Sequence, residues 1–174
     1  TNPRFFWIGP KPVSLEHQHI QKETQPNLLQ GYCATEKADG LRCLIYVDDT
    51  GSCYAITMNS KIYSLKYKTE DTTFYNSILD AEYVFQDKEG NRLEYFGIFD
   101  IYYKNGENIM ALPFVSRDKE TRSRIKEFSQ FRFQSKQIQV NPKTFLVPPK
   151  NDDIWKVSHE LIRRMDNGTF PYYT

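Results

Sequence analysis

The stretch Glu36-Lys37-Ala38-Asp39-Gly40-Leu41-Arg42 sets a lysine, an aspartate and a glycine between a short apolar run and a long pattern typical of β-strands. At average residue usage, a chance Lys-x-Asp-Gly match occurs in roughly a few per cent of chains of this length, so the motif alone is a weak signal. Two further motifs, Asp80-Ala81-Glu82 and Phe99-Asp100, follow on predicted strands and strengthen the signal. We expect the lysine to lie at a strand end, where the chain turns.

Composition indicates one domain without a strong electric field of its own. The chain has 174 residues, and its 23 Lys and Arg nearly balance its 22 Asp and Glu. A dedicated nucleic-acid binder usually carries a marked basic excess, so any RNA contact must be local. Phe, Trp and Tyr make up 15% of the residues, which favours strands and an aromatic core.

The cysteines and the apolar runs suggest a cytoplasmic location. Cys33, Cys43 and Cys53 have neither the spacing of a zinc site nor that of a disulfide framework, which suits a reducing compartment. No apolar run reaches the ~18 residues of a membrane span, and no signal peptide is recognisable. We therefore predict no membrane association.

Local patterns predict an α+β fold with a mainly antiparallel sheet and flanking helices. Strands are expected at residues 28–35, 42–47, 52–57, 62–65, 77–85, 93–103 and 138–147, the last interrupted by Asn141-Pro142. Helices are expected from Ser14 to Lys22, from an N-cap at Ser116 to Phe128, and from an N-cap at Asn151 or Asp152 to Gly168. Residues 1–12, rich in proline, are expected to form an extended piece docked on the domain.

In their order, the lysine stretch, Asp80-Ala81-Glu82 and Phe99-Asp100 resemble the motifs of the covalent nucleotidyltransferases, which comprise mRNA-capping guanylyltransferases, DNA ligases and RNA ligases. Glu-Lys-Ala-Asp-Gly-Leu-Arg is most similar to the capping enzymes, especially those of large DNA viruses. The resemblance covers about residues 30 to 174. It implies that residues 1–174 form the N-terminal part of a nucleotidyltransferase domain. The family's late metal-binding and Lys-x-Lys strands and its OB-fold domain are not recognisable.

The resemblance implies that Lys37 is the nucleophile. A lysine that attacks phosphorus must be neutral, although its ordinary pKa is ~10.4, so a nearby cation or desolvation has to lower that pKa. The neighbouring acids oppose this change. Strand alternation would point Glu36 away from Lys37, and Gly40 would let the chain turn after Asp39. A divalent ion, Mg²⁺ or Mn²⁺, would supply positive charge on the phosphates, and its protein ligands are unknown.

The other motif residues are expected to bind the nucleotide. Arg42 would contact phosphate or ribose, and Glu82 would contact the sugar or assist the metal, although Ala81 departs from the family's usual Asp-Gly-Glu. Phe99 would stack on the purine, with room for the base above Gly97. The full predicted set is Glu36, Asp39, Gly40, Arg42, Lys61, Glu82, Phe99 and Asp100. Lys66-Tyr67-Lys68 imitates the family's late Lys-x-Lys element but precedes the acidic motif, so its order excludes it.

The implied function is mRNA capping. Lys37 would form lysyl-GMP from GTP and pass GMP to a 5′-diphosphate RNA end. One alternative is an ATP-dependent polynucleotide ligase that uses the same lysine, although such enzymes often carry an acidic residue at the position of Leu41. Another is an inactive scaffold or RNA-binding module, against which the intact lysine motif argues. Triphosphatase and methyltransferase domains could share the polypeptide.

Overall fold

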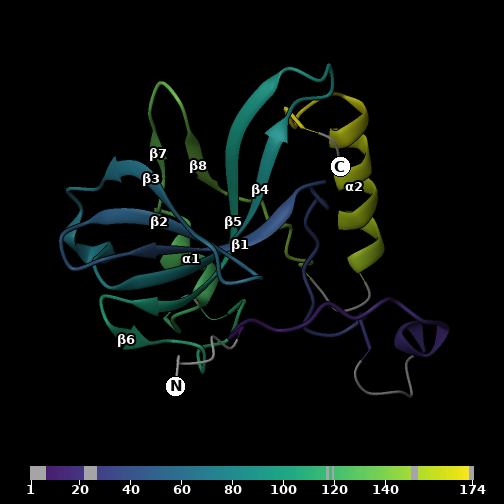
Figure 1. Cartoon of the computed structure of the whole chain (residues 1–174). Coiled ribbons are helices and arrows are strands. Elements are labelled where there is room, and N and C mark those ends of the chain that lie inside the picture. The colour runs from purple at the N-terminus through teal and green to yellow at the C-terminus, as the bar shows by residue number, and fades with distance from the viewer. Residues whose placement is uncertain (1–6, 22–26, 117, 119, 150–152, 173–174) are drawn as a thin grey trace.

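A computed structural model of the chain describes residues 7–21, 27–116, 118, 120–149 and 153–172. Within this part, one curled eight-stranded sheet carries few helices, so the fold is mostly β (Figure 1). The strands are β1 (Leu41–Val47), β2 (Ser52–Thr57), β3 (Ile62–Lys68), β4 (Ser77–Gln86), β5 (Arg92–Lys104), β6 (Glu107–Asn108), β7 (Phe133–Gln134) and β8 (Gln139–Pro142). The helices are the 3-10 turns η1 (His17–Ile20) and η2 (Thr72–Phe74), and the α-helices α1 (Arg124–Phe128) and α2 (Ile154–Asp166).

The sheet is mixed but mainly antiparallel, as predicted. The strands follow the order β3-β2-β1-β4-β5-β8-β7, and β6 pairs with β5. The two predicted hairpins, β1–β2 and β4–β5, are confirmed. The pair β5–β8 is parallel. The strand predicted over 138–147 is shorter than expected and ends at Pro142, whose nitrogen has no proton to donate to the ladder.

The strand predicted over residues 28–35 is wrong. Only Ala34 pairs, through an isolated bridge to Leu146 with N–O distances of 3.0 and 2.8 Å. The preceding residues turn instead, and Gly31 adopts a left-handed backbone with φ of 75°. Lys37 therefore follows a bridge rather than a strand.

The helix predicted from Ser116 begins only at Arg124. Ser123 is the N-cap, and its hydroxyl accepts the backbone N–H of Lys126 at 3.3 Å. Upstream, the Asp118 carboxylate accepts the Glu120 N–H at 3.0 Å. That local bond competes with helix formation, as short polar side chains commonly do.

The two terminal helices also differ in how well they were predicted. In place of the helix expected from Ser14 to Lys22, the structure has only the short 3-10 turn η1, and Lys22 lies outside the described residues. The last, α2, is confirmed, although its predicted caps Asn151 and Asp152 lie outside the described residues. The helix ends at Gly168, which has a left-handed backbone with φ of 68°. The Gly168 N–H donates to the Met165 carbonyl, and the Thr169 N–H donates to the Arg164 carbonyl. No helix in the described part is long and apolar enough to cross a membrane.

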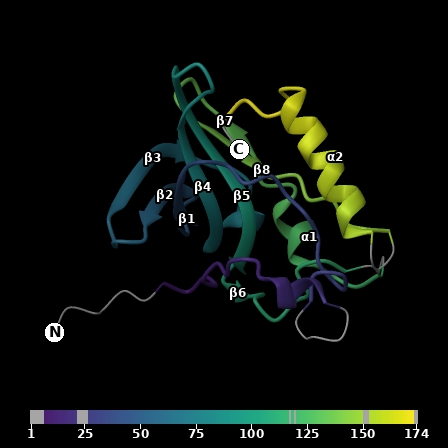
Figure 2. The same cartoon turned by 90° about the vertical axis from the view of Figure 1, so that its right-hand side faces the viewer.

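The two faces of the sheet bury different sets of side chains. The concave face holds the main core, to which Ile45, Leu79 and Ile98 contribute, closed by phenylalanines from the segment after β6. The opposite face carries Asp80 and Glu82 and is covered in part by α2 (Figure 2). There, a smaller cluster packs Leu161 of α2 beside Ala38, Val84, Tyr95, Phe170 and Tyr172.

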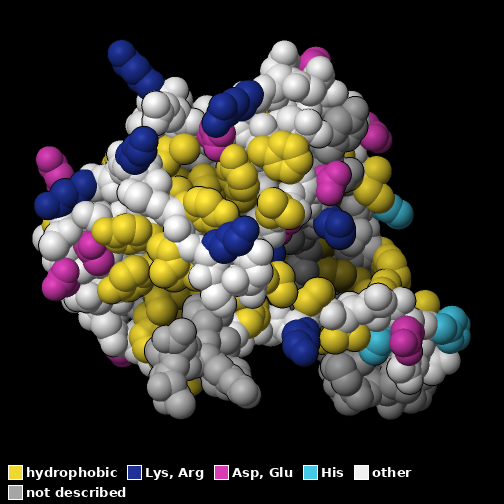
Figure 3. Space-filling model, in the orientation of Figure 1, with side chains coloured by type: hydrophobic (Ala, Val, Ile, Leu, Met, Phe, Trp, Pro, Cys, Tyr) yellow, Lys and Arg dark blue, Asp and Glu magenta, His cyan; other side chains and the backbone are white. Residues whose placement is uncertain are grey.

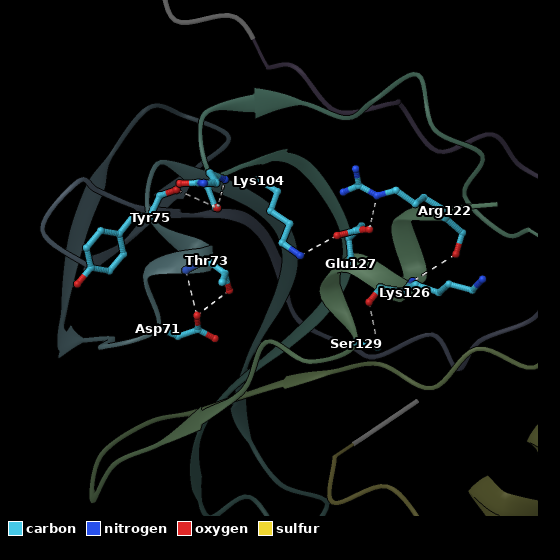
Figure 4. A network of polar contacts seen from close by, with 11 residues as sticks. Asp71, Thr73, Tyr75, Lys104, Arg122, Lys126, Glu127 and Ser129 are labelled. Atoms are coloured by element: carbon cyan, nitrogen blue, oxygen red, sulfur yellow. Dashed lines mark hydrogen bonds and ion pairs between the residues drawn. The ribbon is translucent and has the colours of Figure 1, made fainter. Parts of the chain in front are cut away.

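An ion-pair network anchors α1 to β5 (Figure 4). Glu127 of α1 accepts a hydrogen bond from Lys104 Nζ at 2.7 Å and one from Arg122 Nε at 2.9 Å. The Lys104 ammonium also lies 5.5 Å from the ring centre of Phe74. These bonds, led by the one from Arg122, lower the pKa of Glu127 below its usual value.

We predict that Glu127→Gln lowers the free energy of unfolding at pH 7 by about 1–2 kcal/mol, because two charge-assisted hydrogen bonds lose their charge. A carboxylate whose pKa is lowered by folding contributes above the ordinary carboxyl pKa, and this contribution is lost as pH falls through the lowered pKa. The difference between variant and parent should therefore shrink below about pH 4.3. Denaturant unfolding across pH checks this, with Glu89→Gln in an exposed turn as control. A difference that persists at pH 2 would contradict it.

Candidate active site

Lys37 lies in an extended segment, residues 35–40, that leads into β1. Burial alternates along it, since Glu36 and Ala38 are buried whereas Lys37 and Asp39 are exposed. Successive side chains of extended backbone point to opposite sides, so the predicted separation of Glu36 from Lys37 is confirmed. Ala38 belongs to the cluster between the sheet and α2, which holds the segment between them (Figure 1).

Glu36 fixes the segment from the inside. Its carboxylate accepts a hydrogen bond from the Tyr172 hydroxyl at 2.9 Å and lies 3.6 Å from Lys143 Nζ. The same ammonium donates to the Glu36 backbone carbonyl at 2.5 Å. Since Glu36 is only 2% exposed, the geometry gives it an anchoring role. A direct contact of Glu36 with a nucleotide stays a prediction.

Gly40 lies at a bend, as expected, and is also required by space. A Cβ at this position would lie 2.4 Å from the Tyr83 carbonyl oxygen and 3.0 Å from Glu82 Cγ. Real Cβ atoms do not approach backbone so closely. The glycine therefore lets the Lys37 segment cross directly over β4.

Arg42 is held by Asp80 in a bidentate pair. Arg42 Nε and one terminal nitrogen donate to the two carboxylate oxygens of Asp80 at 3.0 and 2.5 Å. Asp80 is fully buried and also accepts a bond from the Tyr102 hydroxyl. The pair raises the pKa of Arg42 and fixes the plane of its guanidinium.

The N-terminal segment contacts this pair. Its described residues are docked on the domain, as predicted for residues 1–12. The Pro10 carbonyl accepts a bond from Arg42 at 2.7 Å, and the Trp7 ring centre lies 5.2 Å from the guanidinium carbon. Gly9 leaves room for the contact, because a Cβ there would lie 2.6 Å from the Tyr102 hydroxyl and 2.9 Å from Arg42.

Two cations lie near the Phe99 ring. Its ring centre is 5.4 Å from the Arg42 guanidinium carbon and 5.9 Å from Lys143 Nζ. In the ladder with β4, Asp100 pairs with Asp80 and Ile98 with Ala81, so a register shift leaves Phe99 without a partner. Such irregularities commonly re-aim a side chain beside a functional site.

The space predicted above Gly97 is not open. A Cβ on Gly97 would lie 3.1 Å from Lys143 Cγ. The aliphatic stem of Lys143 therefore fills the room that was expected for a base. Its backbone N–H donates to the Ile98 carbonyl at 2.7 Å, which fixes the lysine beside β5.

Glu82 is the carboxylate around which three cations gather. Burial raises its pKa, and the charges of Lys143, Lys37 and Arg42 oppose that rise. Burial likewise lowers the pKa of Lys143, with Glu36 and Glu82 opposing and Lys37 adding to the decrease. Lys37 and Lys143 therefore repel each other. We call Lys37, Arg42, Glu82, Phe99 and Lys143 the lysine cluster.

The remaining predicted residues lie behind or beside the lysine cluster. Asp100 is buried 3.4 Å from Arg124 Nε, and burial raises its pKa to about 6. Asp39 and Lys61 are exposed, the latter in the β2–β3 turn. In the described part, no side-chain contact joins Asp39 or Lys61 to the lysine cluster.

Sequence reasoning missed Lys143 and Trp7. Lys143 comes directly after the proline that interrupts an apolar run, and a lysine so placed was the one available signal. The parallel pairing of β8 with β5, which brings Lys143 to Gly97, has no local signature. Trp7 was noted only as part of an extended piece.

The arrangement suits a phosphate-bearing ligand. In the described part, no group of three histidine, cysteine or acidic side chains could hold a metal ion. Asp80 and Glu36 are already engaged by Arg42 and Lys143. Mg²⁺ commonly binds through one or two carboxylates together with substrate phosphates.

Comparisons with known proteins agree with this geometry. The sequence model of "mRNA capping enzyme, catalytic domain" matches residues 3–169. The chain is 32% identical over 127 residues to the mRNA-capping enzyme subunit alpha of Yarrowia lipolytica, which covers 66% of this chain and 32% of that protein. It is 30% identical over 119 residues to the mRNA-capping enzyme of Caenorhabditis elegans, which covers 63% of this chain and 18% of that protein. The aligned part thus spans a third or less of these relatives, and the chain belongs to the family of mRNA capping enzyme catalytic domains.

Proposed function

We propose that the chain carries the guanylyltransferase step of mRNA capping. The Lys37 nitrogen attacks the α-phosphorus of GTP, the bond to the β-phosphate breaks, and pyrophosphate leaves behind a lysyl-GMP phosphoramidate. A terminal oxygen of a 5′-diphosphate RNA then attacks the same phosphorus and releases Lys37. The exposed position of Lys37 directly after the buried and anchored Glu36 is the observation that carries the proposal.

Lys143 positions the segment that carries the nucleophile. Its ammonium donates to the backbone carbonyl of Glu36, the residue directly before Lys37, at 2.5 Å. Attack on phosphorus requires the Lys37 nitrogen to be held in line with the bond that breaks, so an anchored neighbour contributes to positioning. We infer that Glu82 contacts the ribose hydroxyls once nucleotide binds.

The other residues position the nucleotide in this proposal. Arg42 donates to Asp80, Tyr102 and the Pro10 carbonyl, which among the described residues leaves one terminal N–H for phosphate or ribose. Phe99 offers a ring for the purine. Lys61, Asp39 and Asp100 stay predicted contacts of the nucleotide. Bound Mg²⁺ or Mn²⁺ would offset the negative charge of the triphosphate.

The whole protein's partners are part of the proposal. GTP and a 5′-diphosphate RNA end are the substrates, and triphosphatase and methyltransferase activities are expected in the same polypeptide or beside it. The cytoplasmic location stays a prediction. So does the particular likeness of the lysine motif to the capping enzymes of large DNA viruses. So does the assignment of residues 1–174 to the first part of the nucleotidyltransferase domain. Both named relatives are capping enzymes, which favours GTP over the ATP of a ligase.

Radiolabelled nucleotide distinguishes these activities. The protein incubated with α-labelled GTP and Mg²⁺ or Mn²⁺ should retain label through denaturing electrophoresis, as an acid-labile and base-stable adduct. Labelled ATP should leave it unlabelled. Labelling by ATP alone would make it a ligase, and labelling by neither would favour an inactive module.

We predict that Lys37→Ala and Lys37→Arg both abolish the adduct. Alanine removes the nucleophile, and a guanidinium stays protonated at working pH. Because Lys37 is exposed, either change should alter the free energy of unfolding by no more than about 0.5 kcal/mol. Adduct yield and denaturant unfolding measure the two effects, with Lys68→Ala, an exposed lysine of β3, as control. An adduct in either Lys37 variant would move the nucleophile elsewhere.

Gly40→Ala tests the seating of the Lys37 segment on β4. The added methyl group would press on the Tyr83 carbonyl and displace Lys37, and a misplacement of about 1 Å can reduce rates about 10²-fold. We expect an adduct rate lower by that order. Gly90→Ala is the matched control, since a Cβ there meets no atom within 4 Å and only its left-handed backbone is strained. Equal adduct rates in the two variants would show that the close approach at Gly40 does not matter.

A further inference from the structure

An open groove of about 870 Å³ lies on the concave face of the sheet, opposite the face of Glu82. Its lining includes Cys43, Ala55 and Phe96, at the mouth of the main core. Figure 3 shows hydrophobic side chains gathered on this side of the molecule with basic side chains around them. We call this the concave groove.

Cations border the concave groove from three separate elements. Lys66 comes from β3, Arg92 from the start of β5, and Lys136 from the turn between β7 and β8, and all three are exposed. Glu94 is the one acidic residue among the described lining residues. It is already bound by Arg92 at 2.5 Å and by the Tyr83 hydroxyl at 2.5 Å. The border therefore has an excess of positive charge, although the whole chain is nearly neutral.

Aromatic rings lie beside these cations. Tyr63 is 52% exposed on the wall of the groove. Tyr83 is half-buried and stacks on the buried Phe96 with ring centres 4.7 Å apart, so Tyr63 is the exposed ring among the described lining residues. Exposed aromatic rings combined with a basic border are what single-stranded nucleic acids bind, because bases stack on the rings while the cations follow the phosphates.

A strained backbone conformation at Lys66 leaves its side chain on the concave groove. Lys66 has φ of 51°, a left-handed conformation that a residue with a Cβ rarely adopts. The register between β2 and β3 shifts here, because Ser52 pairs with Lys68 but Tyr54 pairs with Ser64. The following Tyr67 packs on Phe133 with ring centres 3.6 Å apart. The irregularity thus sends one side chain into the core and leaves Lys66 on the groove.

The concave groove begins beside the Lys37 segment. Leu41 and Tyr83 line it, and they are the neighbours of Gly40 and Glu82 in the chain. Leu41 is the fourth residue after Lys37, so the two are separated by at most about 14 Å. A chain that leaves Lys37 can therefore pass the start of β1 and enter the groove.

We propose that the concave groove binds the single-stranded 5′ segment of the RNA that accepts GMP, with Lys66, Arg92 and Lys136 on its phosphates. The inference rests on the proposed function for the identity of the acceptor. The positive border favours an anionic chain over an apolar protein segment. The groove's ring-lined wall favours unpaired bases over a duplex, whose bases are stacked on one another.

Binding of a fluorescent single-stranded RNA of about 20 nucleotides to the protein, followed by anisotropy across a salt series, tests the proposal. The variant Lys66→Glu/Lys136→Glu should bind at least about 10-fold more weakly, with a log–log salt slope smaller by about 1.4, since each lost phosphate contact removes about 0.7. Lys68→Glu, on the same strand but outside the groove, should change affinity less than twofold. Lys66→Arg/Lys136→Arg should restore binding.

Two further measurements separate this inference from the proposed function. The double Glu variant should form the GTP adduct at the parent's rate, and should transfer GMP normally to a diphosphate-ended dinucleotide, whose single internucleotide phosphate cannot contact both Lys66 and Lys136. Transfer to the 20-nucleotide RNA should require at least about 10-fold more RNA. A GTP-labelling failure in the parent would reject guanylyl transfer while the anisotropy still reports on the groove. Equal losses in Lys68→Glu and in the double variant, or unchanged RNA affinity, would overturn the groove assignment and leave an apolar protein segment as its occupant.

Discussion

The hydrogen bond from the Lys143 ammonium to the Glu36 backbone carbonyl joins β8 to the segment that carries Lys37. Around it, the Glu36 carboxylate has been taken out of water, which is costly unless cations and donors surround it. Lys143 and the Tyr172 hydroxyl meet that need from two distant parts of the chain. Removing one partner of such a buried pair typically costs about 3–5 kcal/mol. The position of Lys37 thus depends on its buried neighbour Glu36.

A similar arrangement holds Arg42. Asp80 is fully buried and would be unfavourable alone, but it receives two bonds from Arg42 and one from Tyr102. The guanidinium is thereby fixed in plane before any ligand arrives. Phosphoryl transfer depends mainly on positioning and on stabilising charge, so a cation that need not reorganise is useful. The contact with Pro10 further limits its freedom.

Much of the fold followed from sequence because its signals are local. Alternation in β1 and the turns after β1 and β4 predicted both hairpins, and the period of α2 predicted the last helix. The errors fall where a long-range contact or a short polar side chain decides the outcome. The strand expected before Lys37 is reduced to one bridge to Leu146, and Asp118 delays the helix expected from Ser116. Lys143 could not be found, because its position depends on a parallel pairing of residues that are 44 apart in the chain, such as Tyr95 and Gln139.

The core itself decides which residues face the candidate active site. In β1, Cys43, Ile45 and Val47 enter the concave core, so Arg42 must point to the other face beside Glu82 and Asp80. A slip of one residue in the pairing with β4 would reverse every side chain, and the cost of exposing that core prevents it. The same alternation places Leu41 and Tyr83 on the concave groove, one residue away from Gly40 and Glu82. The sheet therefore separates the two candidate binding faces by its own thickness, and the start of β1 at Leu41 is where a proposed ligand of one face would continue onto the other.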